Sequence, residues 1–244
     1  MVEYFNLRIK KDSKFIKISG GQGRPVALIS TLESGDMGYS ETRNYRKSQL
    51  CEDLKVNEKR LFQIKQLHSM KVHHVNIQDY GLDIRGDGLI TNDRNCILAV
   101  TVADCLPIFI YDKKSGSFSL LHSGWKGTGI GLSALKMIIK KTKTRPENVE
   151  IIMGPSIGSC CYSVDRERAG IFLNKWGQDS VIRRDNDFFI DLKEANRNMF
   201  INMGVKNIKI AGNCTYCSPF LGSFRRQGSD SFTRMLAIYG YLDI

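Results

Sequence analysis

The stretch VTVADCLPIFIYDKKSGSFSLLHSGWKGTGIG, residues 100–131, decides the fold of this chain. It carries most of three apolar runs, Ile97–Val102, Pro107–Tyr111 and Phe118–Leu121. Short apolar runs bounded by polar residues and glycine predict buried β-strands. The glycine-rich segment 124–131 follows them and leads into a helical pattern. The stretch therefore predicts strands, a glycine loop and a helix in succession.

Two side chains in this stretch are candidates for a functional site, because they stand where apolar runs begin or end. Cys105 precedes the second run and His122 follows the third, and they lie 17 residues apart. That separation is the reach of a strand hairpin, so both are expected at one edge of a sheet. Since α/β proteins tend to place reactive residues at strand ends, we predict that Cys105 and His122 form the centre of a site.

Composition favours an enzyme-sized globular chain. The 244 residues are 42 % hydrophobic, which suits one domain over residues 1–244 with a substantial core. The first residues lack the charged and apolar segments of a signal peptide, and no apolar run approaches the roughly 18 residues of a membrane span. We therefore expect a cytoplasmic protein without a membrane partner, as a monomer or a small homo-oligomer.

The chain is strongly basic, with 36 lysines and arginines against 25 aspartates and glutamates. A basic chain raises nucleic acid as a partner. The basic residues are scattered, however, and no nucleic-acid motif accompanies them. The charge therefore favours a solvated surface and an anionic small substrate over nucleic acid.

The seven cysteines are expected to be reduced thiols rather than a disulfide framework. Cys214 and Cys217 have the spacing of a redox or zinc pair, but one such pair favours a structural role. The pattern leaves the roles of Cys160 and Cys161 open.

The rest of the chain alternates strands and helices after residue 57, which predicts an α/β (α+β) fold with a mixed sheet flanked by helices. Before that point, residues 2–10 and 14–19 predict an opening hairpin. Helices are expected from Ser40 or Thr42 to Cys51 and over 57–67, 133–142, 165–176 and 192–203. Further strands are expected over 26–30, 72–77, 149–153, 188–191, 208–211 and 233–242, and residues 85–91 are expected to form a turn that leads into a strand.

Three interpretations of the site remain open from the residues alone. His68, at an element junction, joins Cys105 and His122 to give two imidazoles and a thiolate, a donor set for zinc or copper with an open fourth position. Alternatively, Cys105 is a nucleophile activated by His122, with Asp104 or Asp87 orienting the imidazole. In the plainest interpretation Cys105 is one more buried thiol.

Several residues are candidates for an anionic or aromatic ligand. The backbone amides of the glycine loop, Gly127 among them, precede a helix and can hold an anion. Trp125 either packs under that loop or stacks on a base. Arg225, Arg226 and Arg234 either bind phosphate or are solvated.

Six strings in order along the chain resemble the YfiH-type laccase-domain family, the multicopper polyphenol oxidoreductase and purine nucleoside phosphorylase family. They are QLHS (66–69), GDGLIT (86–91), VADCLPIFIYD (102–112), HSGWKGTG (122–129), GPSIGSCCYSV (154–164) and SFRRQ (223–227). The resemblance runs from about residue 60 to the last residue.

This resemblance implies a single-domain layered α/β fold similar to the catalytic domain of cytotoxic necrotizing factor. It implies a zinc site on His68, Cys105 and His122, with copper as the other metal. It also implies phosphorolysis of adenosine, inosine, guanosine and methylthioadenosine, with adenosine deamination. Asp87 is then a catalytic or ligand-orienting carboxylate, and the expected substrate-binding residues are Arg225, Arg226, Trp125 and Gly127.

Two alternatives accompany this expectation: a peptidoglycan-precursor editing hydrolase with Cys105 as nucleophile, and a copper polyphenol oxidase. Multicopper oxidases need many histidines, and this chain has four. The chain also departs from the family pattern, because an arginine expected near Leu32 is missing and Arg43 or Arg46 would have to replace it. Lys126 stands where the family usually has arginine, which keeps the charge but loses a bidentate donor.

Overall fold

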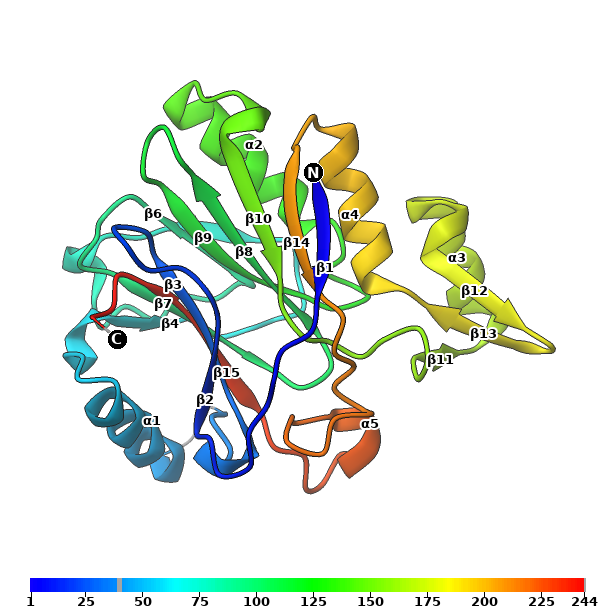
Figure 1. The fold of residues 1–244 in the computed structure, drawn as a ribbon, viewed down its shortest axis with the longest axis horizontal. Helices are drawn as coiled ribbons and strands as arrows, with labels where there is room; N and C mark the ends of the chain where they lie inside the picture. Colours follow the sequence, from blue (N-terminus) through cyan, green and yellow to red (C-terminus); the bar gives the residue numbers. More distant parts are fainter. Residues whose placement is uncertain (39–40, 244) are drawn as a thin grey trace.

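Two mixed β-sheets face each other in the computed structural model of the chain, which describes residues 1–38 and 41–243 (Figure 1). The seven-stranded sheet has the order β1 (Val2–Phe5), β14 (Asn207–Ala211), β10 (Val149–Met153), β8 (Leu106–Asp112), β9 (Phe118–Ser123), β6 (Gly88–Thr91), β5 (Val72–His74). The five-stranded sheet has the order β2 (Phe15–Ser19), β3 (Val26–Ser30), β15 (Met235–Gly240), β7 (Ile97–Val102), β4 (Leu61–Gln63).

Alternation along the strands decides which layer each residue enters. Ile108 and Ile110 of β8 pack on the helix side with residues of α2 (Ile130–Thr142) and α4 (Leu192–Asn202), whereas Phe109 packs between the two sheets. Helix α1 (Glu41–Asp53) covers the outer face of the five-stranded sheet. Helix, sheet, sheet and helix thus form successive layers. Alternate residues of a strand point to opposite faces of its sheet, so each strand contributes side chains to two neighbouring layers.

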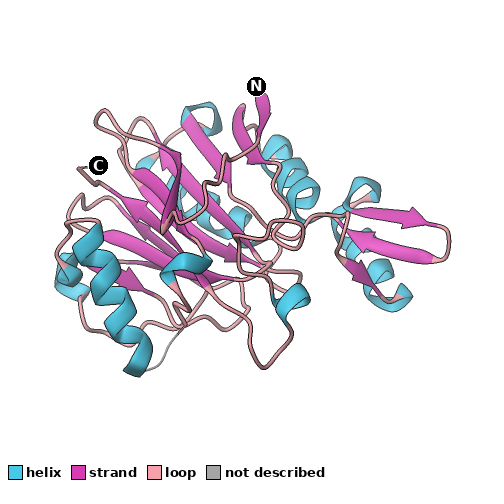
Figure 2. Ribbon diagram, turned by 60° about the horizontal axis from the view of Figure 1, so that its bottom comes forward, coloured by secondary structure: helices cyan, strands magenta, loops and turns pink. Residues whose placement is uncertain are grey.

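A smaller lobe projects beside α4, at the right in Figure 1. It holds a three-stranded sheet of β11 (Ser163–Val164), β13 (Asp187–Ile190) and β12 (Val181–Arg184), together with α3 (Arg166–Trp176). Figure 2 shows the antiparallel hairpin of β12 and β13 in this lobe standing away from the main layers. The remaining helical pieces are α5 (Phe224–Gln227) and the 3-10 turns Leu32–Ser34, Glu58–Arg60, Ile77–Asp79, Pro146–Asn148 and Gln178–Ser180.

The mixed α/β class is confirmed, and so are the strands and the helix of the 100–131 stretch. The predicted opening hairpin is wrong, because β1 pairs in parallel with β14 of one sheet while β2 pairs with β3 of the other. The predicted strand over 72–77 ends at His74. Strand β12 went unpredicted, and the predicted helix start at Ser40 lies outside the described residues.

The predicted helix over 57–67 is also wrong. Asn57 caps only one 3-10 turn, and the chain then continues as β4. Leu61 enters the outer core beside α1, whereas Phe62 and Ile64 enter the core between the sheets. The apolar residues therefore alternate faces, and a strand parallel to β7 buries both sets where a helix would expose one. Among the described residues, no helix is long and apolar enough to cross a membrane.

Candidate active site

The hairpin of β8 and β9 brings Cys105 and His122 together, as predicted. Cys105 lies immediately before β8, and His122, near the end of β9, stands opposite Pro107 in the ladder. His68 arrives from the segment after β4, and its ring meets the His122 ring edge-on at 4.9 Å between centroids. The Cys105 thiol and one ring nitrogen from each histidine all lie within 4.8 Å of one another.

Asp87 organises this group. Its fully buried carboxylate accepts hydrogen bonds from the His122 ring (2.9 Å to Nδ1), from the Ser69 hydroxyl (2.7 Å), and from three backbone amides. Those amides belong to Leu67 (3.2 Å), His68 (3.0 Å) and Ser69 (2.6 Å). They fold the 67–69 segment around the carboxylate and hold His68 in the left-handed region at φ 56°. One carboxylate therefore positions both histidines, through the backbone of one and the ring of the other.

The charges in the group reinforce one another. Burial alone would raise the pKa of Asp87, but hydrogen bonds from His122 and Ser69 outweigh it and lower the pKa to about 2. Burial likewise opposes ionisation of Cys105, but His122 and His68 lower the pKa of the thiol to about 6. For His122, burial disfavours the imidazolium, yet Cys105 and Asp87 raise its pKa to about 9. Without a metal, the protein thus stabilises a Cys105 thiolate next to a His122 imidazolium at neutral pH.

A cavity of about 870 Å³ opens over the three side chains. Its walls combine aromatic rings with cations. The aromatic lining residues are Trp125, Tyr162, Phe224 and Phe232. The cationic lining residues are Lys65, Lys126, Arg168, Arg225 and Arg234. The volume lies in the range of small-molecule sites, and the walls suit a ligand with a flat ring and a negative charge.

The predicted ligand-binding residues divide into two groups. Trp125 lines the cavity with the Arg168 guanidinium over its ring at 4.7 Å, and Arg225 lines it with its guanidinium 5.6 Å from the Tyr162 ring. Arg226 instead donates to the carbonyls of the 214–221 loop: Thr215 at 2.6 Å, Tyr216 and Ser218 at 2.8 Å, and Leu221.

Gly127 is a packing position. A Cβ there would lie 3.1 Å from the Ser69 carbonyl oxygen, so glycine lets the 122–129 loop approach the segment that carries His68. Arg234 reaches the cavity while it donates to Asp36 at 3.2 Å.

Asp104, one of two predicted orienting carboxylates, has a different task. It accepts from the Thr215 hydroxyl at 2.6 Å and from the Arg225 backbone amide at 2.7 Å. Its φ of 82° lies in the left-handed region, where the turn before β8 reverses. Asp104 therefore fixes the wall that carries Arg225, and Asp87 orients the imidazole.

Sequence reasoning missed five aromatic or cationic wall residues: Lys65, Tyr162, Arg168, Phe224 and Phe232. Tyr162 stands inside a string that resembles the family, which was its available signal. Arg168 lies on α3 and gives no local signal, because only the placement of the lobe brings it to the Trp125 ring.

Arg46, one of the two predicted replacements for the arginine expected near Leu32, is not among the cavity-lining residues that the structure describes. Arg46 lies against Gly35, since a Cβ added there would fall 2.5 Å from its Nη1. The side chain of Arg43, the other predicted replacement, is outside the described part of the chain.

Comparison with known proteins gives one family and consistent relatives. The model of the multi-copper polyphenol oxidoreductase laccase family matches residues 28–241. The chain is similar to purine nucleoside phosphorylase YlmD of Geobacillus stearothermophilus, with 30 % identity over 239 residues that cover 91 % of this chain and 86 % of the relative. It is also similar to a purine nucleoside phosphorylase of Borreliella burgdorferi, with 34 % identity over 176 residues that cover 69 % and 75 %.

Solved structures agree with this assignment. The crystal structure of YlmD from Geobacillus stearothermophilus superposes with a TM-score of 0.88 and 26 % identity, covering 97 % of this chain and 99 % of that one. The crystal structure of Bacillus licheniformis hypothetical protein YfiH gives a TM-score of 0.82 and 25 % identity, covering 88 % and 92 %.

Proposed function

The chain belongs to the multi-copper polyphenol oxidoreductase laccase family, and from this premise we propose that it is a purine nucleoside phosphorylase. The observation that carries the proposal is the cavity, where aromatic and cationic walls meet above His68, Cys105 and His122. The names of the relatives support the same activity. The proposed substrates are phosphate with adenosine, inosine, guanosine or methylthioadenosine.

The walls suggest how the two substrates are held. Trp125, Tyr162 and Phe224 offer ring faces on which a purine stacks. Arg225 and Lys126 offer positive charge for phosphate, and Arg225 adds a planar set of donors that matches phosphate oxygens. In phosphorolysis a phosphate oxygen bonds to the ribose C1′ while the C1′–N9 bond breaks and its electron pair stays on the purine. The cations compensate the charge of the phosphate and keep it beside the sugar.

His68, Cys105 and His122 would hold a zinc ion, with copper as the alternative. The donor set fits, because two imidazoles and a thiolate converge within 4.8 Å. The hydrogen bond between Nδ1 of His122 and the Asp87 carboxylate leaves Nε2 as the nitrogen available to a metal. A bound zinc supplies Lewis acidity at an open coordination position. Asp87 keeps the proton of His122 on Nδ1, so the lone pair of Nε2 faces the group. We extend the proposal to adenosine deamination, in which water replaces the amine on the purine and ammonia leaves.

We further propose that residues 1–244 act as one catalytic domain, as a monomer or small homo-oligomer without a nucleic-acid partner. All seven cysteines are free thiols, which supports a reducing compartment such as the cytoplasm.

The test measures free base and ribose 1-phosphate from inosine, with and without phosphate, in enzyme from a host that lacks its own nucleoside phosphorylases and deaminases. We expect His122→Ala and Cys105→Ala to lower turnover by at least about 100-fold. His74→Ala is the matched control, because His74 contacts Lys141 on the surface. Full turnover in His122→Ala or Cys105→Ala would refute the assignment.

A second candidate rests on a specific observation, the depressed pKa of Cys105 next to His122 and Asp87. A thiolate, an imidazole and a carboxylate in this order are the parts of a nucleophilic hydrolase, for which peptidoglycan precursors are the candidate substrate. A covalent acyl adduct on Cys105 after incubation with muropeptide, together with no phosphorolysis, would favour this candidate. Polyphenol oxidation by several coppers has less support, because His73 bonds the Arg85 carbonyl and His74 bonds Lys141.

A further inference from the structure

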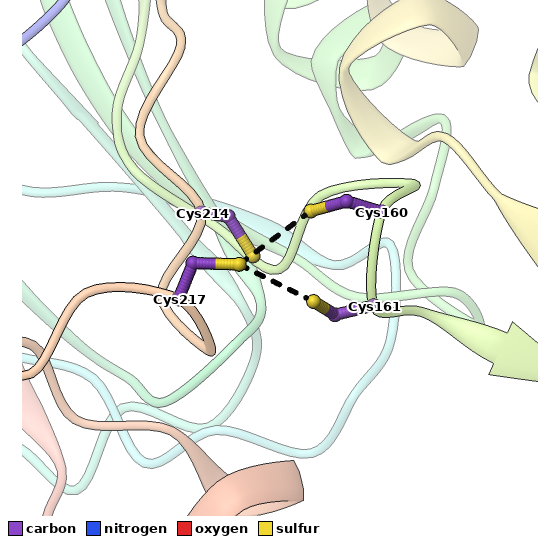
Figure 3. Close-up of side chains that lie close together, drawn as sticks. All are labelled: Cys160, Cys161, Cys214 and Cys217. Carbon is purple, nitrogen blue, oxygen red and sulfur yellow. Dashed lines mark hydrogen bonds between the residues drawn. The ribbon is translucent and has the colours of Figure 1, made fainter.

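A second group of metal-binding side chains lies outside the cavity lining. Cys160 and Cys161 follow the turn after β10, while Cys214 and Cys217 follow β14. Figure 3 shows the four sulfur atoms pointing toward one another from these two segments. All four lie within 4.8 Å of one another, and Cys217 Sγ is 3.8 Å from Cys160 Sγ and 3.4 Å from Cys161 Sγ.

We propose that Cys160, Cys161, Cys214 and Cys217 bind one zinc ion as a tetrathiolate structural site, separate from the His68, Cys105 and His122 group. A tetrahedral zinc with Zn–S bonds of about 2.3 Å places its sulfurs about 3.8 Å apart. The measured separations of 3.8 and 3.4 Å are close to that spacing. The sequence offered only the 214–217 pair, so the second pair comes from the fold.

The surroundings fit a negatively charged tetrathiolate. The Gly158 amide donates to Cys214 Sγ at 3.2 Å, the kind of bond that stabilises a thiolate ligand. Lys193, only 8 % exposed, donates from Nζ to the Asn213 carbonyl at 3.1 Å, beside Cys214. A buried ammonium needs compensating charge; Asp191 supplies part of it, and four thiolates on one zinc would add a net charge of −2. A Cβ at Gly158 would lie 3.2 Å from Cys160 Sγ, so glycine permits the close approach.

Other uses of four thiols fit the geometry less well. A disulfide has sulfurs about 2.05 Å apart, whereas Cys217 Sγ lies 3.8 Å from Cys160 Sγ and 3.4 Å from Cys161 Sγ. An iron–sulfur cluster would place its own iron and sulfide atoms between the thiolates and separate them more widely. Cys160 and Cys217 are exposed, which gives an ion a path into the site.

The four-cysteine group lies where two segments of the cavity wall begin. The 160–161 pair directly precedes Tyr162, and the 214–217 pair opens the loop that leads to Phe224 and Arg225. One zinc ion would tie together two segments that come from different parts of the chain and form one wall of the cavity. The inference does not depend on nucleoside turnover, because it concerns metal bound outside the catalytic group.

Zinc content in the His68→Ala background isolates the proposed site. By elemental analysis of reduced, purified protein we expect about two zinc ions per chain in wild type, about one in His68→Ala, and none in His68→Ala with Cys217→Ala. His68→Ala with Cys51→Ala is the matched control and should retain about one zinc ion, since Cys51 is a residue of α1 that is buried in the outer core, away from the four-cysteine group. A mercurial that titrates thiols should release that one zinc from His68→Ala.

Three results would overturn the proposal: zinc in His68→Ala that Cys217→Ala leaves unchanged, iron in place of zinc, or a disulfide among the four cysteines found by mass spectrometry without reductant. A second measurement, on cobalt-loaded protein, needs only a single variant and therefore remains informative if the double variants misfold. Wild type should show strong thiolate-to-cobalt absorption, and Cys217→Ala alone should lose most of it while keeping the weaker absorption of the His68 group. Equal absorption in wild type and Cys217→Ala would also contradict the proposal. Failure of the phosphorolysis assay would leave all of these readouts unaffected.

Discussion

Replacing Asp87 by asparagine tests whether one buried carboxylate builds the catalytic group. The shape is conserved, but one of the two acceptor oxygens becomes an amide that can only donate. If the remaining oxygen keeps the bonds from Leu67 and Ser69, the new amide faces the His68 amide and Nδ1 of His122. The His68 amide then loses its acceptor. His122 would have to accept on Nδ1, and its proton would move to Nε2, the atom needed for the metal.

The magnitude follows from these two losses. An orphaned buried amide and a lost charge-assisted bond cost about 1–3 kcal/mol each, so the metal-free variant should be about 2–6 kcal/mol less stable. Loss of a carboxylate that orients a histidine ligand typically weakens metal binding by about 10- to 100-fold. We therefore expect the loss of stability and the loss of zinc affinity in Asp87→Asn to fall within these two ranges, and we expect turnover to fall along with metal occupancy.

Urea denaturation of metal-free protein measures the first quantity, and zinc competition with a chromophoric chelator measures the second. Asp112→Asn is the matched control, because Asp112 is also fully buried and accepts from Thr144 at 2.9 Å and Ser115 at 2.5 Å, away from the cavity. It should lose stability but retain zinc affinity. Wild-type zinc affinity in Asp87→Asn, or equal loss in both variants, would refute the reasoning.

Three further predictions follow from the geometry. In metal-free protein, alkylation of Cys105 should rise with pH around a midpoint of about 6, because its lowered pKa yields thiolate above that pH; Cys51, whose pKa burial raises to about 11, should stay unmodified at neutral pH. Gly124→Ala would place a Cβ 2.8 Å from Cys105 Sγ and should weaken zinc binding at least about 10-fold by chelator competition, whereas Gly170→Ala, in open space, should not. Arg226→Ala removes the donor to four loop carbonyls and should cost about 3 kcal/mol in urea denaturation; an unchanged midpoint would contradict its role in holding the loop.

The centre of the site was predictable because it lies within one hairpin. Cys105 and His122 flank two strands whose apolar character is plain in the sequence, and antiparallel pairing of neighbouring strands follows almost automatically. His68 was a candidate from its place at an element junction, and the resemblance to the family supported it, although its position depends on a strand that the sequence presented as a helix. A run with Leu61, Phe62 and Ile64 fits both the helical period of 3.6 residues and the strand period of two. Only pairing with the neighbouring β7 decides between them.

The walls of the cavity were less predictable, because they depend on contacts between distant segments. Arg225 and Arg226 are adjacent and chemically identical in the sequence, yet one lines the cavity and the other donates to loop carbonyls. The short helix α5 turns successive side chains in different directions, and no local pattern indicates which one faces the cavity. The four-cysteine group has the same origin, since its two pairs lie more than fifty residues apart.

A short path joins the proposed zinc site to the catalytic group. Thr215, next to Cys214, donates its hydroxyl to Asp104, and Asp104 is the residue before Cys105. The same carboxylate accepts a hydrogen bond from the backbone amide of Arg225, so the segment that carries the Cys105 thiol and the proposed phosphate-binding wall share one anchor. In the proposed site, zinc would hold residues 214–217 on one side and this carboxylate would hold them on the other, so loss of zinc would loosen the Arg225 wall first. Asp87 would still hold His68 and His122, since its partners are residues 67–69 and His122 and none of them belongs to the 214–226 segment.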